Sequence, residues 1–185
     1  MNWFAFAVAI IAAGLLTWMG VVFNRFIRGR NRLREAWSGV DVQLKRRHDL
    51  VPELVECVRG YSSYERTLLE ELTQARSQAL VALGATQASE AEGGLVNRLR
   101  SLFAVAEVYP DIKANRSFQD LHTNLIEIED QLQYARRYYN GTVRDYNILV
   151  ESFPSRIIAH LFGFTSATFF EIESAVERAA QEVRL

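Results

Sequence analysis

The stretch that decides the fold is EAWSGVDVQLKRRHDLVPELVECVRGY, residues Glu35 to Tyr61. Together with Leu33, it places apolar side chains at alternating steps of four and three residues, a spacing that keeps one stripe of a helix facing partner helices. The apolar positions of this stripe are Leu33, Trp37, Val40, Leu44, Val51, Leu54, Val58 and Tyr61.

Arg47 occupies the one place in the stripe where an apolar residue is due. A buried arginine needs a carboxylate partner, and an Asp or Glu of the fourth helical segment, such as Glu127 or Asp130, could supply it. The alternative is that the side chain extends along the stripe to water. Both alternatives stay open from the sequence.

Two further features bear on where this helix bends and ends. Pro52 lies inside the pattern and removes one backbone hydrogen bond, yet the repeat keeps its phase, which predicts a bend within one helix. Gly60 could end the helix, because Ser62 to Glu65 matches a capping box for a new one. Whether the chain turns at Gly60 or continues is left open.

Three more segments show the same spacing, and they predict an antiparallel four-helix bundle with long helices. The second stripe is Leu68 or Leu69, Leu72, Ala75, Ala79 and Leu83. The third is Leu95, Leu99, Leu102, Ala106 and Tyr109. The fourth is Leu121, Leu125, Ile128, Leu132, Ala135, Tyr139, Val143 or Thr142, Tyr146, Val150 and Phe153.

Turn-forming residues separate these segments. Gly84 to Gly94, GATQASEAEGG, is small and polar with glycine at both ends, so we expect a loop there. Pro110 ends the third segment, Ser117 is the expected cap of the fourth, and Pro154 closes the fourth.

Ahead of the bundle, Trp3 to Phe23 contains twenty-one residues without a charge. As a helix it would be about 31 Å long, close to the thickness of a bilayer's hydrocarbon core. A signal peptide would need a positive n-region, and only Met1 and Asn2 precede the apolar run. The sequence therefore predicts an N-terminal transmembrane helix.

A cluster of five arginines, with no acidic residue among them, follows the apolar segment. The five are Arg25, Arg28, Arg30, Arg32 and Arg34. Arginine at mid-membrane costs about 2.5–3.5 kcal/mol on insertion scales, so these side chains should contact anionic headgroups or cytosol. The positive-inside rule then predicts a bacterial inner-membrane protein with its N-terminus outside and its bundle in the cytoplasm.

The chain therefore divides into a span at 1–24, a basic segment at 25–34, a bundle at 35–153 and a C-terminal part at 154–185. This last part begins with an apolar aromatic segment that could cap the bundle, lie on the membrane or bind a partner. Its candidate contact residues are Ile157, Ile158, Leu161, Phe162, Phe164, Phe169 and Phe170. From Glu171 to Leu185 the spacing predicts an amphipathic tail helix.

The sequence contains no motif that indicates nucleic-acid binding, metal binding or catalysis. The net charge of −1 does not provide the basic field of a nucleic-acid binder, so no nucleic-acid partner is expected. There is no Glu-x-x-His pair of the kind that builds metal sites in helical bundles, and no phosphate-binding glycine loop. Cys57, the single cysteine, flanks a buried position and is expected to be a structural thiol. We therefore expect no cofactor, no metal site and no catalytic residue.

The chain resembles the LemA family. The segments that carry the resemblance are Glu35 to Tyr61, Arg98 to Phe118, Ala135 to Asn147, Phe153 to Ala159, and the phenylalanines Phe164 and Phe170. The resemblance implies an N-terminal span followed by an antiparallel four-helix bundle, and it implies no enzymatic activity. A member that forms magnetosomes suggests membrane organisation, and a frequent genomic neighbour is a membrane zinc protease.

This sequence departs from the family pattern in two places. Ser63-Tyr64 stands where the family has a residue-His pair, and the chain runs on from Ile172 to Leu185, where many relatives have ended.

Three functions are open at this point. The first is a membrane scaffold that self-associates as a homo-oligomer, and the second is an adaptor that binds one membrane protease or transporter. The third is an enzyme whose site forms between subunits, and it requires a nucleophile and base that the sequence does not pair.

Overall fold

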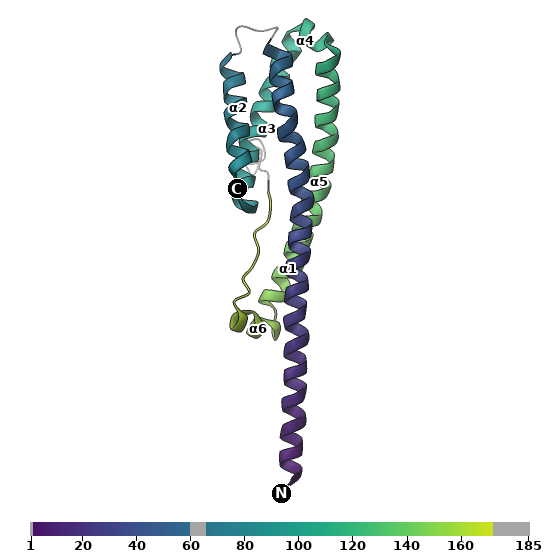
Figure 1. The fold of residues 1–185 in the computed structure, drawn as a ribbon, viewed down its shortest axis with the longest axis vertical. Helices are drawn as coiled ribbons and strands as arrows, with labels where there is room; N and C mark the ends of the chain where they lie inside the picture. Colours follow the sequence, from purple (N-terminus) through teal and green to yellow (C-terminus); the bar gives the residue numbers. More distant parts are fainter. Residues whose placement is uncertain (1, 60–65, 172–185) are drawn as a thin grey trace, which may run out of the picture. The chain divides into compact units, whose positions relative to one another are not determined.

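The computed structural model describes residues 2–59 and 66–171. The boundary at Gly60, the capping box at 62–65 and the expected tail helix lie outside these ranges. Within them the chain is all-helical and forms no strand. The six helices are α1 (Asn2–Arg59), α2 (Arg66–Val81), α3 (Gly84–Val108), α4 (Pro110–Ala114), α5 (Arg116–Glu151) and α6 (Ser155–Phe162) (Figure 1).

The chain divides into two compact units, and α1 and α5 each contribute to both. The first unit contains Met1–Trp37 and Tyr138–Thr168, and the second contains Ser38–Arg137 and Phe169–Leu185. The basic segment and the start of the predicted bundle are therefore parts of one continuous helix, because α1 runs unbroken to Arg59.

The second unit is built around one apolar cluster to which α1, α2, α3, α4 and α5 all contribute. Its fully buried members include Leu54 of α1, Leu72 of α2, Leu102 of α3 and Ile112 of α4. The four-three spacing places most predicted stripe residues of the second and third segments in or against the cluster, together with the end of the first stripe and the start of the fourth. Leu83 is an exception: it is 80% exposed, because it precedes the first residue of α3 rather than continuing α2.

The stretch from Gly84 to Gly94 is helical, so the expected loop is wrong. The helix α3 begins at Gly84, and the connection from α2 is only two residues long. Gly84 adopts a left-handed φ of 76°, and the Gln87 side chain accepts a hydrogen bond from the Leu83 N–H at 3.0 Å. Alanines and other good helix formers between the glycines offset the cost of about 1 kcal/mol for each interior glycine.

The first turn of α5 is capped by Asn115 rather than by Ser117. The Asn115 side-chain oxygen accepts a hydrogen bond from the Phe118 N–H at 3.2 Å, as a helix N-cap does. Asn115 is the last residue before α5, and its extended backbone separates α4 from α5.

Helix α1 continues through Pro52, as the unbroken phase of the repeat predicts. Proline has no N–H, so the carbonyl of His48, four residues earlier, loses its helical donor. Arg76 of α2 supplies a replacement: its Nε donates to the His48 carbonyl at 2.7 Å. A neighbouring helix thus satisfies the acceptor that proline leaves unpaired.

The first unit packs α6 and the end of α5 against α1. Val22 and Phe26 of α1 form an apolar cluster with Tyr146 of α5 and Ile158 of α6. At Gly29, an added Cβ would lie 2.9 Å from Tyr146 Cδ2, so a close approach of α1 to α5 requires glycine there. In Figure 1, α6 lies beside α1, and the N-terminal part of α1 extends beyond it.

After α6 the chain turns at Gly163, whose φ of 69° is left-handed, and continues without helix. The side-chain amide of Asn147 in α5 pairs with the backbone of Ala167 in this segment. It donates to the Ala167 carbonyl at 2.9 Å and accepts from the Ala167 N–H at 2.7 Å. The Tyr139 hydroxyl donates to the Thr168 carbonyl at 3.0 Å. The segment 163–168 is therefore attached to α5 by side chains.

Candidate functional site

A buried polar network lies in the core of the second unit. Arg47 of α1 is only 1% exposed, and its two terminal nitrogens donate to carboxylates on two different helices. Nη1 donates to Glu92 Oε2 of α3 at 2.9 Å, and Nη2 donates to Glu129 Oε2 of α5. The partners proposed from the sequence, Glu127 and Asp130, are both exposed.

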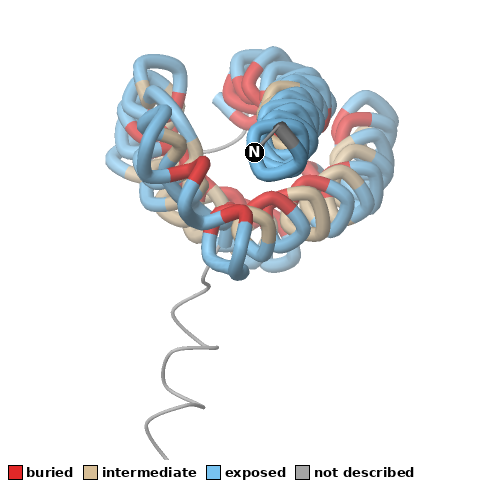
Figure 2. Tube along the Cα trace, turned by 90° about the horizontal axis from the view of Figure 1, so that it is seen from below, coloured by how far each residue is buried: buried red, intermediate tan, exposed pale blue. Residues whose placement is uncertain are grey.

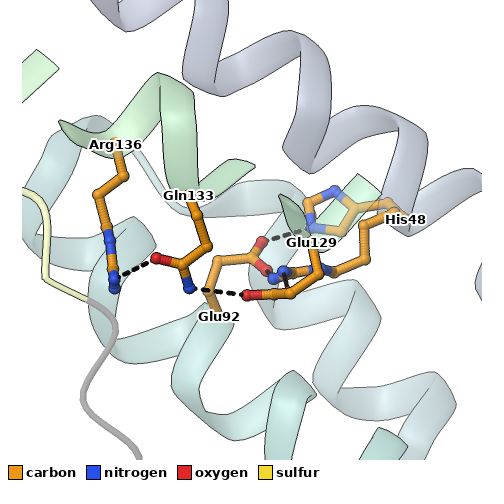
Figure 3. A network of polar contacts seen from close by, with 6 residues as sticks. His48, Glu92, Glu129, Gln133 and Arg136 are labelled. Carbon is orange, nitrogen blue, oxygen red and sulfur yellow. Dashed lines mark hydrogen bonds and ion pairs between the residues drawn. The ribbon is translucent and has the colours of Figure 1, made fainter. Parts of the chain in front are cut away.

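The network extends on both sides of this arginine (Figure 3). His48 Nε2 donates to the second oxygen of Glu92 at 2.5 Å, so both oxygens of that buried carboxylate are engaged. On α5, Gln133 donates to Glu129 at 3.2 Å, and Arg136 donates to Gln133 at 2.5 Å. The side chain of Glu129 is 42% exposed, and the network reaches the surface there.

Sequence reasoning missed Glu92 because its segment was expected to be a loop. A usable signal was present: Ala88, Glu92, Leu95 and Leu99 follow the four-three spacing, and all four are buried. Glu92 therefore interrupts the core stripe of α3 as Arg47 interrupts that of α1.

The chemistry of this network is structural. The buried charges of Arg47 and Glu92 are engaged by each other, by Glu129 and by His48. Across residues 2–59 and 66–171, no cluster of His, Cys, Asp and Glu could hold a metal ion. Cys57 is partly buried, and burial raises the pKa of its thiol, which disfavours the reactive thiolate.

The first unit carries most of the residues predicted to contact membrane or partners, and Phe169 and Phe170 belong to the second. All described side chains from Trp3 to Thr17 are exposed, and the end of α1 marked N is pale blue in Figure 2. Within the described chain, α1 is the one helix long and apolar enough, by length and composition, to cross a membrane. Phe23, the last residue of the predicted span, packs its ring 4.9 Å from that of Phe162 of α6.

The five arginines are all exposed, but they have different neighbours. Arg25, Arg28 and Arg32 line a groove of about 820 Å³ between α1 and the end of α5. Arg30 lies over the ring of Phe164, with its guanidinium carbon 5.9 Å from the ring centroid. The structure therefore separates the five arginines, which look alike in the sequence, into three that line the groove and two that do not.

The apolar residues after Pro154 also divide. Ile158 and Phe170 are buried, and the ring of Phe164 stacks on that of Phe26 at 4.6 Å, so these three side chains pack inside the protein. The remaining candidates stay exposed on α6 and just after it. They are Ile157, Leu161, Phe162 and Phe169.

These features define an all-helical protein with one candidate membrane-spanning helix among the described residues. The sequence model of the LemA family matches residues 36–185, and the chain belongs to the LemA family. Family membership and the apolar helix together indicate a membrane-associated protein.

Two kinds of named relatives are similar to the chain. Magnetosome protein MamQ 2 of Paramagnetospirillum magneticum is 25% identical over 179 residues, which cover 83% of this chain and 66% of that relative. Protein LemA of Metamycoplasma hominis is 28% identical over 135 residues, which cover 72% of this chain and 58% of that relative. The chain thus spans just under two thirds of the length of the first relative and less of the second.

Proposed function

We propose that this protein is a single-pass membrane scaffold. Trp3 to Phe23 crosses the bacterial inner membrane with the N-terminus outside, and the part that follows forms an antiparallel four-helix bundle in the cytoplasm. The bundle and α6 present surfaces through which copies of the chain associate laterally. No step of this function requires a catalytic residue or a cofactor.

The observation that carries the proposal is the bare apolar surface at the start of α1. Trp3 is 90% exposed, and every described side chain from Trp3 to Thr17 is exposed. Left in water, this surface would be far larger than the isolated apolar patches that soluble proteins tolerate. A bilayer covers it at no cost in hydrogen bonding, because a helix satisfies its own backbone.

Two further features support a retained anchor rather than a cleaved leader. Val22 and Phe26 are buried in the cluster with α5 and α6, so cleavage near the end of the span would remove part of a packed core. Five arginines directly follow the apolar segment, as in a span whose following domain stays in the cytoplasm. A similar magnetosome protein is consistent with membrane organisation.

Site-specific crosslinking in membranes tests the scaffold. In a Cys57→Ser background, Leu161→Cys places a thiol on the exposed face of α6, and Ser101→Cys places one on an exposed position of α3. A scaffold that associates through α6 gives a dimeric self-adduct from Leu161→Cys and little from Ser101→Cys, because the single thiol of each chain can link only two copies.

The second candidate function, an adaptor for one membrane protein, predicts a different pattern. A single adduct with a foreign protein, without self-adducts, would contradict the scaffold and support the adaptor. Release of the full-length chain from membranes by alkaline carbonate would refute both functions.

A further inference from the structure

The groove in the first unit has a lining that changes character along its length. From α1 it receives Trp18, Val22, Arg25 and Arg32, together with Gly29 between the arginines. These positions are four, three, four and three residues apart, so they form one face of the helix. The face is apolar at its N-terminal end and basic at its C-terminal end.

The opposite wall follows the same order. The exposed ring of Phe153, just after the end of α5, lines the groove together with Trp18 and Val22. Thr142, which lies earlier in α5, also lines the groove and carries a polar hydroxyl. An amphiphile with an apolar chain and an anionic head would match this sequence of surfaces. The volume of about 820 Å³ lies within the range of small-molecule sites.

The charge of the groove is not balanced by the protein. Three arginines, Arg25, Arg28 and Arg32, line it, and none of them forms an ion pair within the described chain. The one carboxylate in the lining is that of Asp145, which lies 3.8 Å from the guanidinium of its neighbour Arg144. Arg47 in the second unit, by contrast, engages two carboxylates.

The arginines also lie at the depth of a phosphate layer if Phe23 ends the span. At 1.5 Å per residue, Arg25, Arg28 and Arg32 are roughly 3, 8 and 14 Å beyond Phe23 along the helix. The headgroup layer of one leaflet is about 5–8 Å thick, so two of the three are level with it. Helix α6 lies at the same height, since the Phe162 ring contacts that of Phe23.

We propose that this groove binds the phosphate of an anionic phospholipid, with Arg25 and Arg28 at the level of the headgroup, Arg32 at its outer edge, and Trp18, Val22 and Phe153 against the acyl chains. The inference rests on the proposed function, because it takes Trp3 to Phe23 to lie in the bilayer. It goes further by assigning lipid binding to a built groove, whereas a general attraction of basic residues to a negative surface would involve all five arginines.

The test compares two matched pairs of substitutions in the full-length chain. Arg28→Gln/Arg32→Gln removes two charges from the groove, and Arg30→Gln/Arg34→Gln removes two charges from the same stretch of α1 outside it. Each protein is reconstituted in nanodiscs of equal phosphatidylcholine and phosphatidylglycerol, and the bound lipids are counted by native mass spectrometry. Circular dichroism melts show whether each variant is folded.

The groove predicts unequal losses. A basic residue near an anionic surface is worth about five-fold in binding, so the groove pair should reduce phosphatidylglycerol retention by about thirty-fold. Arg30→Gln/Arg34→Gln, the pair outside the groove, should reduce phosphatidylglycerol retention by a factor several times smaller. Arg28→Lys/Arg32→Lys, which keeps the charges, should retain most of the wild-type binding. Equal losses from the two pairs would overturn the groove and leave only a surface potential.

Two further arms identify the source of the phosphate. Inorganic phosphate and glycerol 3-phosphate are titrated onto the wild-type protein in phosphatidylcholine nanodiscs, and neither should raise the melting temperature. Stabilisation by either soluble phosphate, without preference for phosphatidylglycerol, would overturn the lipid assignment. Carbonate extraction of each variant distinguishes failure of the groove proposal from failure of the proposed function. If the variants stay in the membrane but the two pairs lose phosphatidylglycerol equally, only the groove proposal is refuted.

Discussion

At the scale of single residues, Arg47 and Glu92 place opposite charges at positions of two core stripes that are otherwise apolar. Such a pair gains little net stability over an apolar pair, because both charges lose their hydration. Removing one partner is different, since it leaves an uncompensated charge in the core. The pair also fixes the register of α1 against α3, because a shift by one position would separate the charges.

We expect Arg47→Ala to lower the free energy of unfolding by about 3–5 kcal/mol. Glu92, 1% exposed, would keep only His48 as a partner. The matched control is Arg46→Ala, an exposed neighbour, which should stay within about 0.5 kcal/mol of wild type. Urea unfolding of the three proteins measures the difference, and equal midpoints for Arg47→Ala and Arg46→Ala would rule out a structural role for the pair.

Tyr139 makes a second prediction at this scale, through its ionisation. Burial raises the pKa of its hydroxyl above the usual value of 10.0, because desolvation disfavours the phenolate. The folded state thus favours the neutral form, so the stabilisation is complete below pH 10 and declines as pH rises through the folded-state pKa.

Tyr139→Phe should cost about 0.5–1.5 kcal/mol at neutral pH through the lost hydrogen bond to Thr168. It should also reduce the loss of stability above pH 10, leaving the contributions of Tyr146 and Cys57, whose pKa values burial also raises. Melting temperatures of both proteins on either side of pH 10 measure this. Parallel profiles would show that Tyr139 does not ionise differently on unfolding.

At the scale of elements, the continuity of α1 depends on a residue from another helix. Pro52 deprives the His48 carbonyl of its helical donor, and Arg76 of α2 takes that donor's place. The contact joins α1 to α2 at the level of the buried network, since His48 also donates to Glu92. An irregularity in one element therefore becomes an attachment between elements.

A double-mutant cycle tests this substitution of donors. Arg76→Ala should cost about 1–3 kcal/mol in the native background, because a buried carbonyl loses its partner. In a Pro52→Ala background the new N–H donates to His48, and Arg76→Ala should then cost much less, with a coupling energy of about 1 kcal/mol or more. Additive effects in denaturant unfolding would mean that Arg76 does not compensate for the proline.

At the scale of the whole molecule, α1 serves three environments in succession. Its first turns are exposed and apolar, its middle joins the cluster of the first unit, and its last turns join that of the second. The residues that cover each part differ accordingly. Protein covers the second and third parts, whereas the proposed bilayer covers the first.

Two charges placed in the first part should therefore abolish membrane integration. Ala9→Arg/Ala13→Arg adds about 5–7 kcal/mol to insertion at mid-membrane. Ser38→Arg/Val42→Arg, at exposed positions of the same helix in the second unit, should have no such effect. The fraction of each protein that resists carbonate extraction gives the result, and full resistance of the first variant would show that these turns do not cross the bilayer.

The sequence by itself determined that the protein is helical, that its core stripes follow a four-three spacing, and that its first turns are uncharged and apolar. These properties depend on local spacing and composition, which a single chain displays directly. It also identified Arg47 as an interruption of a stripe and a carboxylate of the fourth segment as its candidate partner, but the partner there is Glu129 rather than Glu127 or Asp130, and Glu92 was missed.

Only the tertiary structure decided which groups meet. Glu92 is the partner of Arg47 because a glycine-containing stretch folds as the start of α3. Arg76 supports Pro52, Asn147 holds the segment after α6, and three of five arginines share a groove, because helices distant in the chain pack side by side. Contacts of this kind depend on the relative rotation and offset of helices, which packing of the whole core sets and the period of one helix does not.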